Sequence, residues 1–131
     1  MRYEVVQQTL KLEPRTWLIT GVAGFIGSNL LETLLRLEQK VVGLDNFLSG
    51  KEWNLAAVQR QVTPAQWERF RFVKGDIREL PVCHEACRNV DFVLHEAAMC
   101  SVPGSIDDPL GAHAINTTGT VHLLAAARDA R

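Results

Sequence analysis

The sequence predicts an α/β fold built on a doubly wound parallel sheet, and three observations lead to that prediction. Four short apolar runs recur along the chain, at residues 17–20, 40–44, 70–73 and 91–95. None of them keeps up an alternation of apolar and polar residues, which is typical of parallel strands covered on both faces. Stretches with helical spacing separate the runs, and such an order predicts right-handed βαβ units. We therefore expect half of a doubly wound sheet, with strand order 3-2-1-4 and helices on both faces.

Helices are predicted between these strands and after the last one, at residues 25–37, 52–60, 81–88 and 110–127. In the first stretch, Ile26, Leu30 and Leu34 recur at the spacing of one helical face. The connection over residues 61–69 is longer, and Thr63 followed by Pro64 predicts the N-cap and first position of a helical turn.

The composition fits a single globular domain. The chain has 131 residues, of which 47% are hydrophobic and 22% are charged. A chain of this length buries roughly two-thirds of its unfolded surface, which is enough for one core. Residues 1–14 are mixed and polar, so we expect an N-terminal arm that Pro14 ends and a domain over residues 15–131.

Charge and cysteine content exclude several kinds of function. Fourteen basic and fifteen acidic side chains give a net charge of -1, so we expect neither a nucleic acid nor an anionic membrane as partner. No apolar run approaches the roughly 18 to 20 residues of a membrane span, and no signal-peptide core is present, so we expect a cytoplasmic protein. Cys83, Cys87 and Cys100 form no disulfide framework. Cys83 and Cys87 share a helical face, but no second ligand pair follows them, so we expect no metal site.

The strongest functional signal is the run Thr20-Gly21-Val22-Ala23-Gly24-Phe25-Ile26-Gly27, which directly follows the first strand and opens a helix. The first glycine permits a tight turn, the second leaves room for a pyrophosphate near the backbone, and the third lets the helix pack on the strand. Free N–H groups at the start of the helix then face the phosphates. This pattern predicts a Rossmann-type dinucleotide site at Gly21, Gly24, Phe25, Ile26 and Gly27. A glycine-rich turn that binds nothing is the alternative.

Acidic residues at the ends of the next two strands extend this site. Asp45 lies eighteen residues after Gly27, close to the spacing of about 20 at which a carboxylate meets the adenosine ribose. A carboxylate there accepts hydrogen bonds from the 2′-hydroxyl and repels a 2′-phosphate, which favours NAD over NADP. Capping of a loop is the alternative role for Asp45. Asp76 and Ile77, after the third strand, are placed to meet the adenine edge, although Gly75-Asp76 is also a favourable turn.

The fourth strand ends in His95-Glu96-Ala97-Ala98, and we expect the cofactor to pass close to Ala97 and Ala98 because they are small. We assign no acid or base role to His95 or Glu96, because a histidine at the end of a buried strand is more often structural. Asn116 is expected to make a hydrogen bond between helix and loop.

With these motifs the sequence resembles the extended short-chain dehydrogenases/reductases, the NAD-dependent epimerase/dehydratase family, and within it the nucleotide-sugar epimerases. The resemblance lies in residues 17–28, 43–47 with Gly50, 75–78, 95–98, 101–103 and 108–109. The N-terminal arm and the stretch around Gln66-Trp67 are similar to the UDP-N-acetylglucosamine 4-epimerases of bacterial surface-polysaccharide synthesis.

This resemblance implies a tightly held NAD, a UDP-sugar substrate and, for the full-length enzyme, a homodimer. In such enzymes a tyrosine takes the proton of the sugar 4-hydroxyl while NAD accepts the hydride, and the 4-keto sugar is then reduced on its other face. The resemblance also places Asn46 beside the cofactor and Ser101 and Val102 beside the sugar.

Two departures from the family pattern limit what the resemblance implies. The catalytic Tyr-x-x-x-Lys pair is absent, because Tyr3 is the single tyrosine and Gln7 stands four residues after it. We therefore expect the N-terminal half of an epimerase, with no catalytic residue and no activity alone. Met99-Cys100 and Gly104 replace a Leu-Gly pair and an arginine, which weakens the substrate assignment. A noncatalytic dinucleotide-binding module and a fragment of a nucleotide-sugar dehydratase or reductase remain alternatives.

Overall fold

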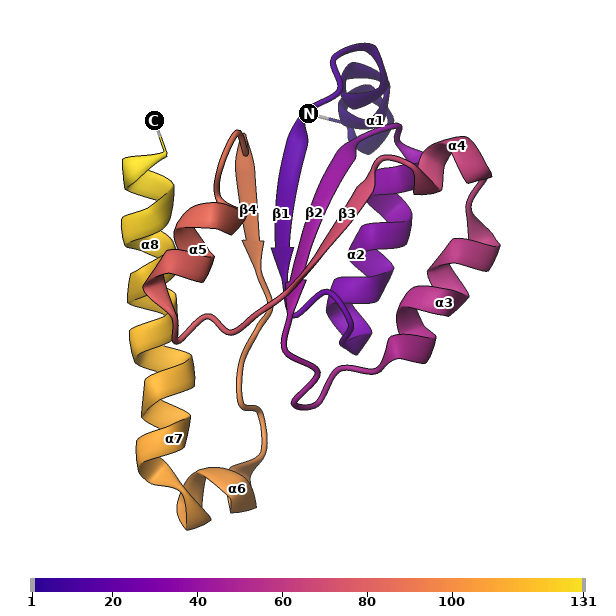
Figure 1. Cartoon of the computed structure of the whole chain (residues 1–131). Coiled ribbons are helices and arrows are strands. Elements are labelled where there is room, and N and C mark those ends of the chain that lie inside the picture. Colours follow the sequence, from indigo (N-terminus) through magenta and orange to yellow (C-terminus); the bar gives the residue numbers. More distant parts are fainter. Residues whose placement is uncertain (1, 131) are drawn as a thin grey trace.

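A computed structural model describes residues 2–130, so the first and last residues of the predicted arm and domain lie outside the described range (Figure 1). Four parallel strands form one sheet, β1 (Thr16–Thr20), β2 (Lys40–Asp45), β3 (Phe70–Lys74) and β4 (Phe92–His95). Their order in the sheet is β3-β2-β1-β4, so the predicted fold class and strand order are confirmed.

Helices precede, connect and follow the strands. They are α1 (Tyr3–Leu12), α2 (Phe25–Arg36), α3 (Glu52–Gln61), α4 (Pro64–Trp67), α5 (Leu80–Ala86), α6 (Val102–Asp107), α7 (Pro109–His113) and α8 (Gly119–Asp129), with a π-helical segment η1 (Ala114–Thr118) before α8. The single helix predicted over residues 110–127 is therefore three segments, and α6 was not predicted. The turn at α4 is as predicted, because the Thr63 hydroxyl accepts from the Gln66 N–H in a capping box.

Two apolar cores lie on opposite faces of the sheet. Leu18 and Val42 pack with Cys83 of α5 and Leu123 of α8 on one face. On the other face, Ile19 and Val41 pack with residues of α2 and α3. Figure 1 shows the two helical layers, with α5 and α8 to the left of the sheet and α2 and α3 to the right. Because neighbouring residues of a strand point to opposite faces, each strand serves both cores, which explains why its apolar run is uninterrupted.

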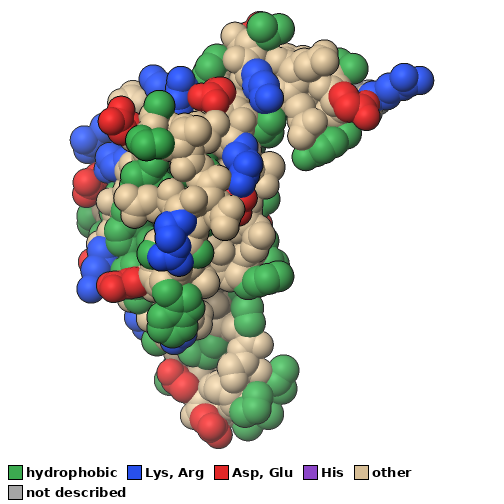
Figure 2. Space-filling model, turned by 90° about the vertical axis from the view of Figure 1, so that its right-hand side faces the viewer, with side chains coloured by type: hydrophobic (Ala, Val, Ile, Leu, Met, Phe, Trp, Pro, Cys, Tyr) green, Lys and Arg blue, Asp and Glu red, His purple; other side chains and the backbone are tan. Residues whose placement is uncertain are grey.

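The N-terminal arm is the helix α1, held at the start of the sheet by a buried side chain. The Gln39 carbonyl oxygen accepts from the Arg15 N–H at 3.0 Å and from the Trp17 indole at 3.1 Å. Its amide donates to the carbonyls of Leu10 and Leu37, both at 2.7 Å. No described residue of α1 is buried, and Figure 2 shows the helix projecting from the top of the molecule.

On the face shown in Figure 2, basic and acidic side chains are interspersed rather than gathered in a basic patch. Among residues 2–130, no helix has both the length and the apolar character needed to cross a lipid bilayer.

Candidate functional site

A cleft of about 300 Å³ opens at the carboxyl ends of the strands. All eleven residues predicted to bind a cofactor line it: Gly21, Gly24, Phe25, Ile26, Gly27, Asp45, Asn46, Asp76, Ile77, Ala97 and Ala98. The other lining residues were not predicted from the sequence: Leu44, Leu48, Ser49, Gly50, Gly75, Glu96, Cys100 and Ile115. Gly50 could have indicated that the β2–α3 loop lines the cleft, because this glycine is one of the residues that carry the resemblance to the epimerase/dehydratase family.

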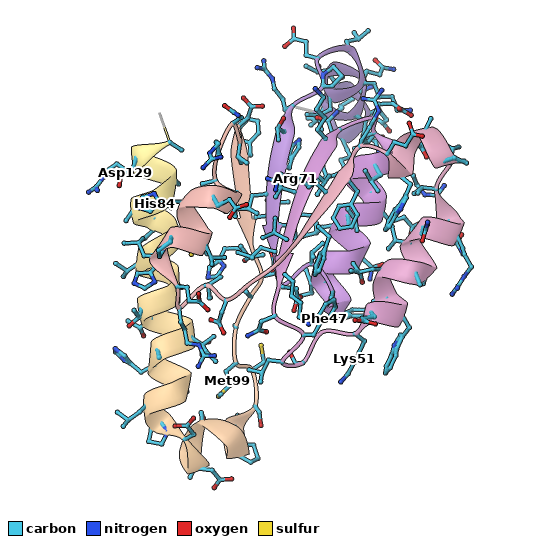
Figure 3. All side chains as sticks on the ribbon, in the orientation of Figure 1. Phe47, Lys51, Arg71, His84, Met99 and Asp129 are labelled. Atoms are coloured by element: carbon cyan, nitrogen blue, oxygen red, sulfur yellow. The ribbon has the colours of Figure 1, made fainter. Side chains whose placement is uncertain are left out.

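Ser101 and Val102, predicted to contact a sugar, lie outside this cleft. The Ser101 hydroxyl caps α6 by accepting from the Gly104 N–H at 3.1 Å. Val102 is 70% exposed on the same helix. Figure 3 labels Phe47 and Lys51 on the β2–α3 loop and Met99 on the β4–α6 connection, all at the same end of the sheet.

The glycine-rich turn is fixed by close packing of its own backbone. Gly21 has a φ of +68°, and a Cβ there would lie 2.8 Å from the Ala97 nitrogen. A Cβ at Gly27 would overlap the Gly21 carbonyl oxygen. No side chain caps the start of α2, where Gly24 is the N-cap residue. The first N–H groups of α2 are therefore available to an anion at this edge of the cleft.

Asp45 joins the glycine-rich turn to the β2–α3 loop. The side chain is buried, with 8% of its surface exposed. One carboxylate oxygen accepts from the Ala23 N–H at 2.9 Å and the other from the Phe47 N–H at 2.8 Å. Asp45 therefore caps a loop, which was the alternative role weighed from the sequence, and it also lines the cleft. Since a carboxylate offers about four acceptor positions, Asp45 retains the capacity to accept from a ligand hydroxyl.

Asp76 is engaged in a different way, because its carboxylate is saturated. Arg78 donates to it from its backbone N–H at 2.9 Å and from two guanidinium nitrogens at 2.9 and 2.6 Å. The Asn46 amide donates a fourth hydrogen bond at 2.9 Å. The Arg78 guanidinium holds the pKa of Asp76 well below its usual range. In contrast, no described residue accepts a hydrogen bond from the adjacent Ile77 N–H. At the predicted adenine edge, the open polar group is therefore this N–H rather than the Asp76 carboxylate.

His95 is part of a closed hydrogen-bond network behind the cleft. The Thr120 hydroxyl donates to the Asn116 carbonyl at 2.7 Å, so its oxygen accepts from Nε2–H of His95 at 3.0 Å. Nδ1 of His95 then accepts from the Thr20 hydroxyl at 2.6 Å. The Thr20 oxygen also accepts from the Ala97 N–H, which fixes the chain where β4 meets the cleft. Burial lowers the pKa of His95, which favours the neutral ring. Both ring nitrogens of His95 therefore have hydrogen-bond partners within the protein.

Asn116 makes the predicted hydrogen bonds between helix and loop. Its amide oxygen accepts from the Met99 N–H at 2.8 Å, and its amide nitrogen donates to the Met99 carbonyl at 3.0 Å. The pair holds the loop after β4 against η1.

Among residues 2–130, no three His, Cys, Asp or Glu side chains gather closely enough to hold a metal ion.

Comparison with known proteins gives the family. The sequence pattern of the family described as GDP-mannose 4,6 dehydratase matches residues 18–131. The chain belongs to this family of epimerases and dehydratases. It is 39% identical over 112 residues to a UDP-glucose 4-epimerase of Mycolicibacterium smegmatis, covering 85% of this chain and 34% of that protein. The chain thus spans about a third of the length of this relative.

Solved structures of the family share the fold. The epimerase Mth375 of Methanothermobacter thermautotrophicus superposes with a TM-score of 0.83 at 29% identity, over 99% of this chain and 37% of that one. A UDP-N-acetylglucosamine 4-epimerase of Methanobrevibacter ruminantium gives a TM-score of 0.75 at 29% identity, over 88% and 34%. DesIV of Streptomyces venezuelae, a dTDP-glucose 4,6-dehydratase with NAD bound, gives 0.76 at 37% identity, over 88% and 36%.

Proposed function

We propose that this chain is the NAD-binding part of a nucleotide-sugar 4-epimerase that interconverts UDP-N-acetylglucosamine and UDP-N-acetylgalactosamine. One observation carries the proposal: a single cleft is lined by the glycine-rich turn, by the buried Asp45 and by Ile77, whose N–H has no acceptor among the described residues. Each is suited to a different part of one dinucleotide, respectively the pyrophosphate, the adenosine ribose and the base.

Asp45 makes NAD the preferred cofactor in this proposal. Its carboxylate is held in place by two backbone N–H groups, so it cannot turn away from a 2′-phosphate without breaking them. Lys74 is the neighbour of Asp45 in the sheet, but its ammonium group lies over the Phe47 ring, 5.9 Å from the centroid, and that of Lys51 lies over the Trp53 ring at 5.8 Å. Neither ammonium group forms an ion pair with the Asp45 carboxylate, whose negative charge therefore repels a 2′-phosphate.

The chain's own residues bind and orient the cofactor, and NAD supplies the hydride acceptor when it is bound. The Tyr-x-x-x-Lys pair that would take the proton of the sugar 4-hydroxyl is absent from the sequence. Tyr3 lies on α1, which Figure 1 shows at the end of the sheet opposite the carboxyl ends of the strands. We accordingly propose that this chain alone binds NAD but does not turn over a nucleotide sugar.

The identity of the sugar substrate is a separate part of the proposal. Similarity of the N-terminal arm to UDP-N-acetylglucosamine 4-epimerases supports an N-acetylated sugar, as does the matching enzyme of Methanobrevibacter ruminantium. We place the full-length enzyme in the cytoplasm, in surface-polysaccharide synthesis. Ser101 and Val102 would contact the sugar, beyond the cleft that takes the dinucleotide.

We further propose that the full-length enzyme is a homodimer. Leu110, Val121 and Leu124 are exposed along α7 and α8. Exposed apolar side chains on one helical segment are typical of helix-to-helix contacts between subunits. Sedimentation of the full-length protein at micromolar concentration should give the mass of a dimer, and a monomer would contradict this assignment.

A dehydratase is the second candidate, because DesIV is 37% identical to this chain and the matching family takes its description from GDP-mannose 4,6 dehydratase. A noncatalytic dinucleotide module is the third, because the Tyr-x-x-x-Lys pair is absent from the sequence.

The proposal is tested by assaying the full-length gene product with NAD and either UDP-N-acetylglucosamine, UDP-glucose or dTDP-glucose, with products identified by NMR. The expected result is the galacto epimer of the N-acetylated sugar. A 4-keto-6-deoxy product would favour the dehydratase. No product with any sugar, together with tight NAD binding, would favour the module.

A further inference from the structure

His122 of α8 holds the backbone at Ile77. Nδ1 of the half-buried His122 ring lies 3.0 Å from the Ile77 carbonyl oxygen. A carbonyl oxygen only accepts, so Nδ1 carries the proton and donates. The Cys83 thiol of α5 donates to the same oxygen at 3.4 Å. Two helices therefore fix one carbonyl in the connection that follows β3.

The Ile77 side chain is held by the same helix. It is 5% exposed and packs in the core with Ile115 and Leu123. A Cβ at Gly119 would lie 2.5 Å from Cδ1 of Ile77, so the absence of a side chain at Gly119 makes the space that Ile77 fills. Carbonyl and side chain of Ile77 are thus both anchored to α8.

The remaining polar group of Ile77 is the one that faces no protein partner. Ile77 lines the cleft, and no described residue accepts from its N–H. The neighbouring Asp76 carboxylate already accepts four hydrogen bonds. This part of the cleft therefore offers one backbone donor without a partner among the described residues, and the position of that donor depends on how Ile77 is anchored to α8.

We propose that His122 is a positioning residue for base recognition: it holds Ile77 so that its N–H donates to a ring nitrogen of adenine. The inference rests on the proposed NAD site. His122 acts through Ile77 and touches neither the cofactor nor the substrate.

The test compares NAD with nicotinamide hypoxanthine dinucleotide, in which N1 of the base carries a hydrogen and no longer accepts. Calorimetric titration of the wild-type chain should show tighter binding of NAD. In His122→Leu, NAD affinity should fall about three- to tenfold, the loss expected for one hydrogen bond. Affinity for the hypoxanthine analogue should stay unchanged. His122→Asn, which keeps an N–H donor, should restore the discrimination.

His113→Leu is the matched control, because His113 is exposed on α7 and makes no hydrogen bond to Ile77. It should bind both dinucleotides as the wild type does. An equal loss of both dinucleotides in His122→Leu, or no loss of either, would overturn the role of His122 while leaving the NAD site intact. A wild-type chain that binds neither dinucleotide would refute the proposed function itself.

Gly119→Ala provides a second test that does not remove a hydrogen bond. The new methyl group should displace Ile77 and weaken NAD binding. Overpacking against the buried Ile77 side chain should cost about 1–3 kcal/mol, of which the preference of alanine over glycine in a helix offsets about 1 kcal/mol, so the chain should remain folded. NAD binding equal to wild type in a folded Gly119→Ala chain would overturn the inference.

Discussion

Replacing Asp45 by alanine tests the cofactor assignment most directly. The substitution removes the acceptors for the two ribose hydroxyls that we place on this carboxylate. Loss of two charge-assisted hydrogen bonds is worth about 2–3 kcal/mol, or a rise of about 30- to 150-fold in the Kd for NAD. Asp45→Arg should instead shift the preference toward NADP, because a guanidinium pairs with the 2′-phosphate.

The same substitution also affects the fold, and the two effects are separable. Asp45 accepts from the N–H groups of Ala23 and Phe47, so its loss should lower the free energy of unfolding by about 1–3 kcal/mol. Asp91→Ala is the matched control, because the Asp91 carboxylate accepts from the Thr16 N–H at 2.8 Å at the amino end of β1. It should lower stability and leave the Kd for NAD unchanged. Calorimetric titration with NAD and urea unfolding measure the two quantities, and an unchanged Kd in a folded Asp45→Ala chain would refute the assignment.

Three further outcomes are expected. Burial lowers the pKa of His95, so the unfolded chain binds a proton more readily than the folded one. The free energy of unfolding should therefore be constant above about pH 6.5 and fall as the pH drops toward the lowered pKa. Urea midpoints that do not change between pH 7.5 and 5.5 would contradict this. Gln39→Ala leaves the Arg15 N–H and the Trp17 indole without their acceptor, which should lower the free energy of unfolding by about 2–4 kcal/mol. It also removes the hydrogen bond to Leu10 of α1, so the amides of α1 should exchange faster. Amides of α1 that stay protected from exchange would show that another contact holds this helix on the sheet. Incubation of this chain with NAD and UDP-N-acetylglucosamine should give no galacto epimer by NMR, and turnover above a buffer blank would place a proton acceptor in this sequence.

The parts of the fold that the sequence predicts are those set by short-range pattern and by topology. Uninterrupted apolar runs predict buried parallel strands, and the carboxyl ends of such strands meet at one edge. The glycine run and Ile77 come after β1 and β3, and Asp45 is the last residue of β2. Because these strands are parallel neighbours, their carboxyl ends bring the three together in one cleft once the strand order is correct.

The parts that could not be predicted depend on contacts between distant residues. The hydrogen bond of His122 joins residues 45 apart in the sequence, and nothing near His122 indicates its partner. Saturation of Asp76 depends on the rotamer of Arg78 and on Asn46 from another loop. The break of the last helix at η1 accompanies the reciprocal pair of Asn116 and Met99, which links the helix to a loop 17 residues earlier.

The placement of the three thiols makes this chain suited to selective labelling. Cys83 of α5 and Cys87, the C-cap residue of that helix, are buried in the core, and burial raises the pKa of both thiols, that of Cys83 to about 11. Thiols of this kind hold almost no reactive thiolate at neutral pH. Cys100, in contrast, is exposed and lines the cleft. A maleimide dye should therefore attach at one position without mutagenesis, and its fluorescence would report directly on whatever enters the cleft.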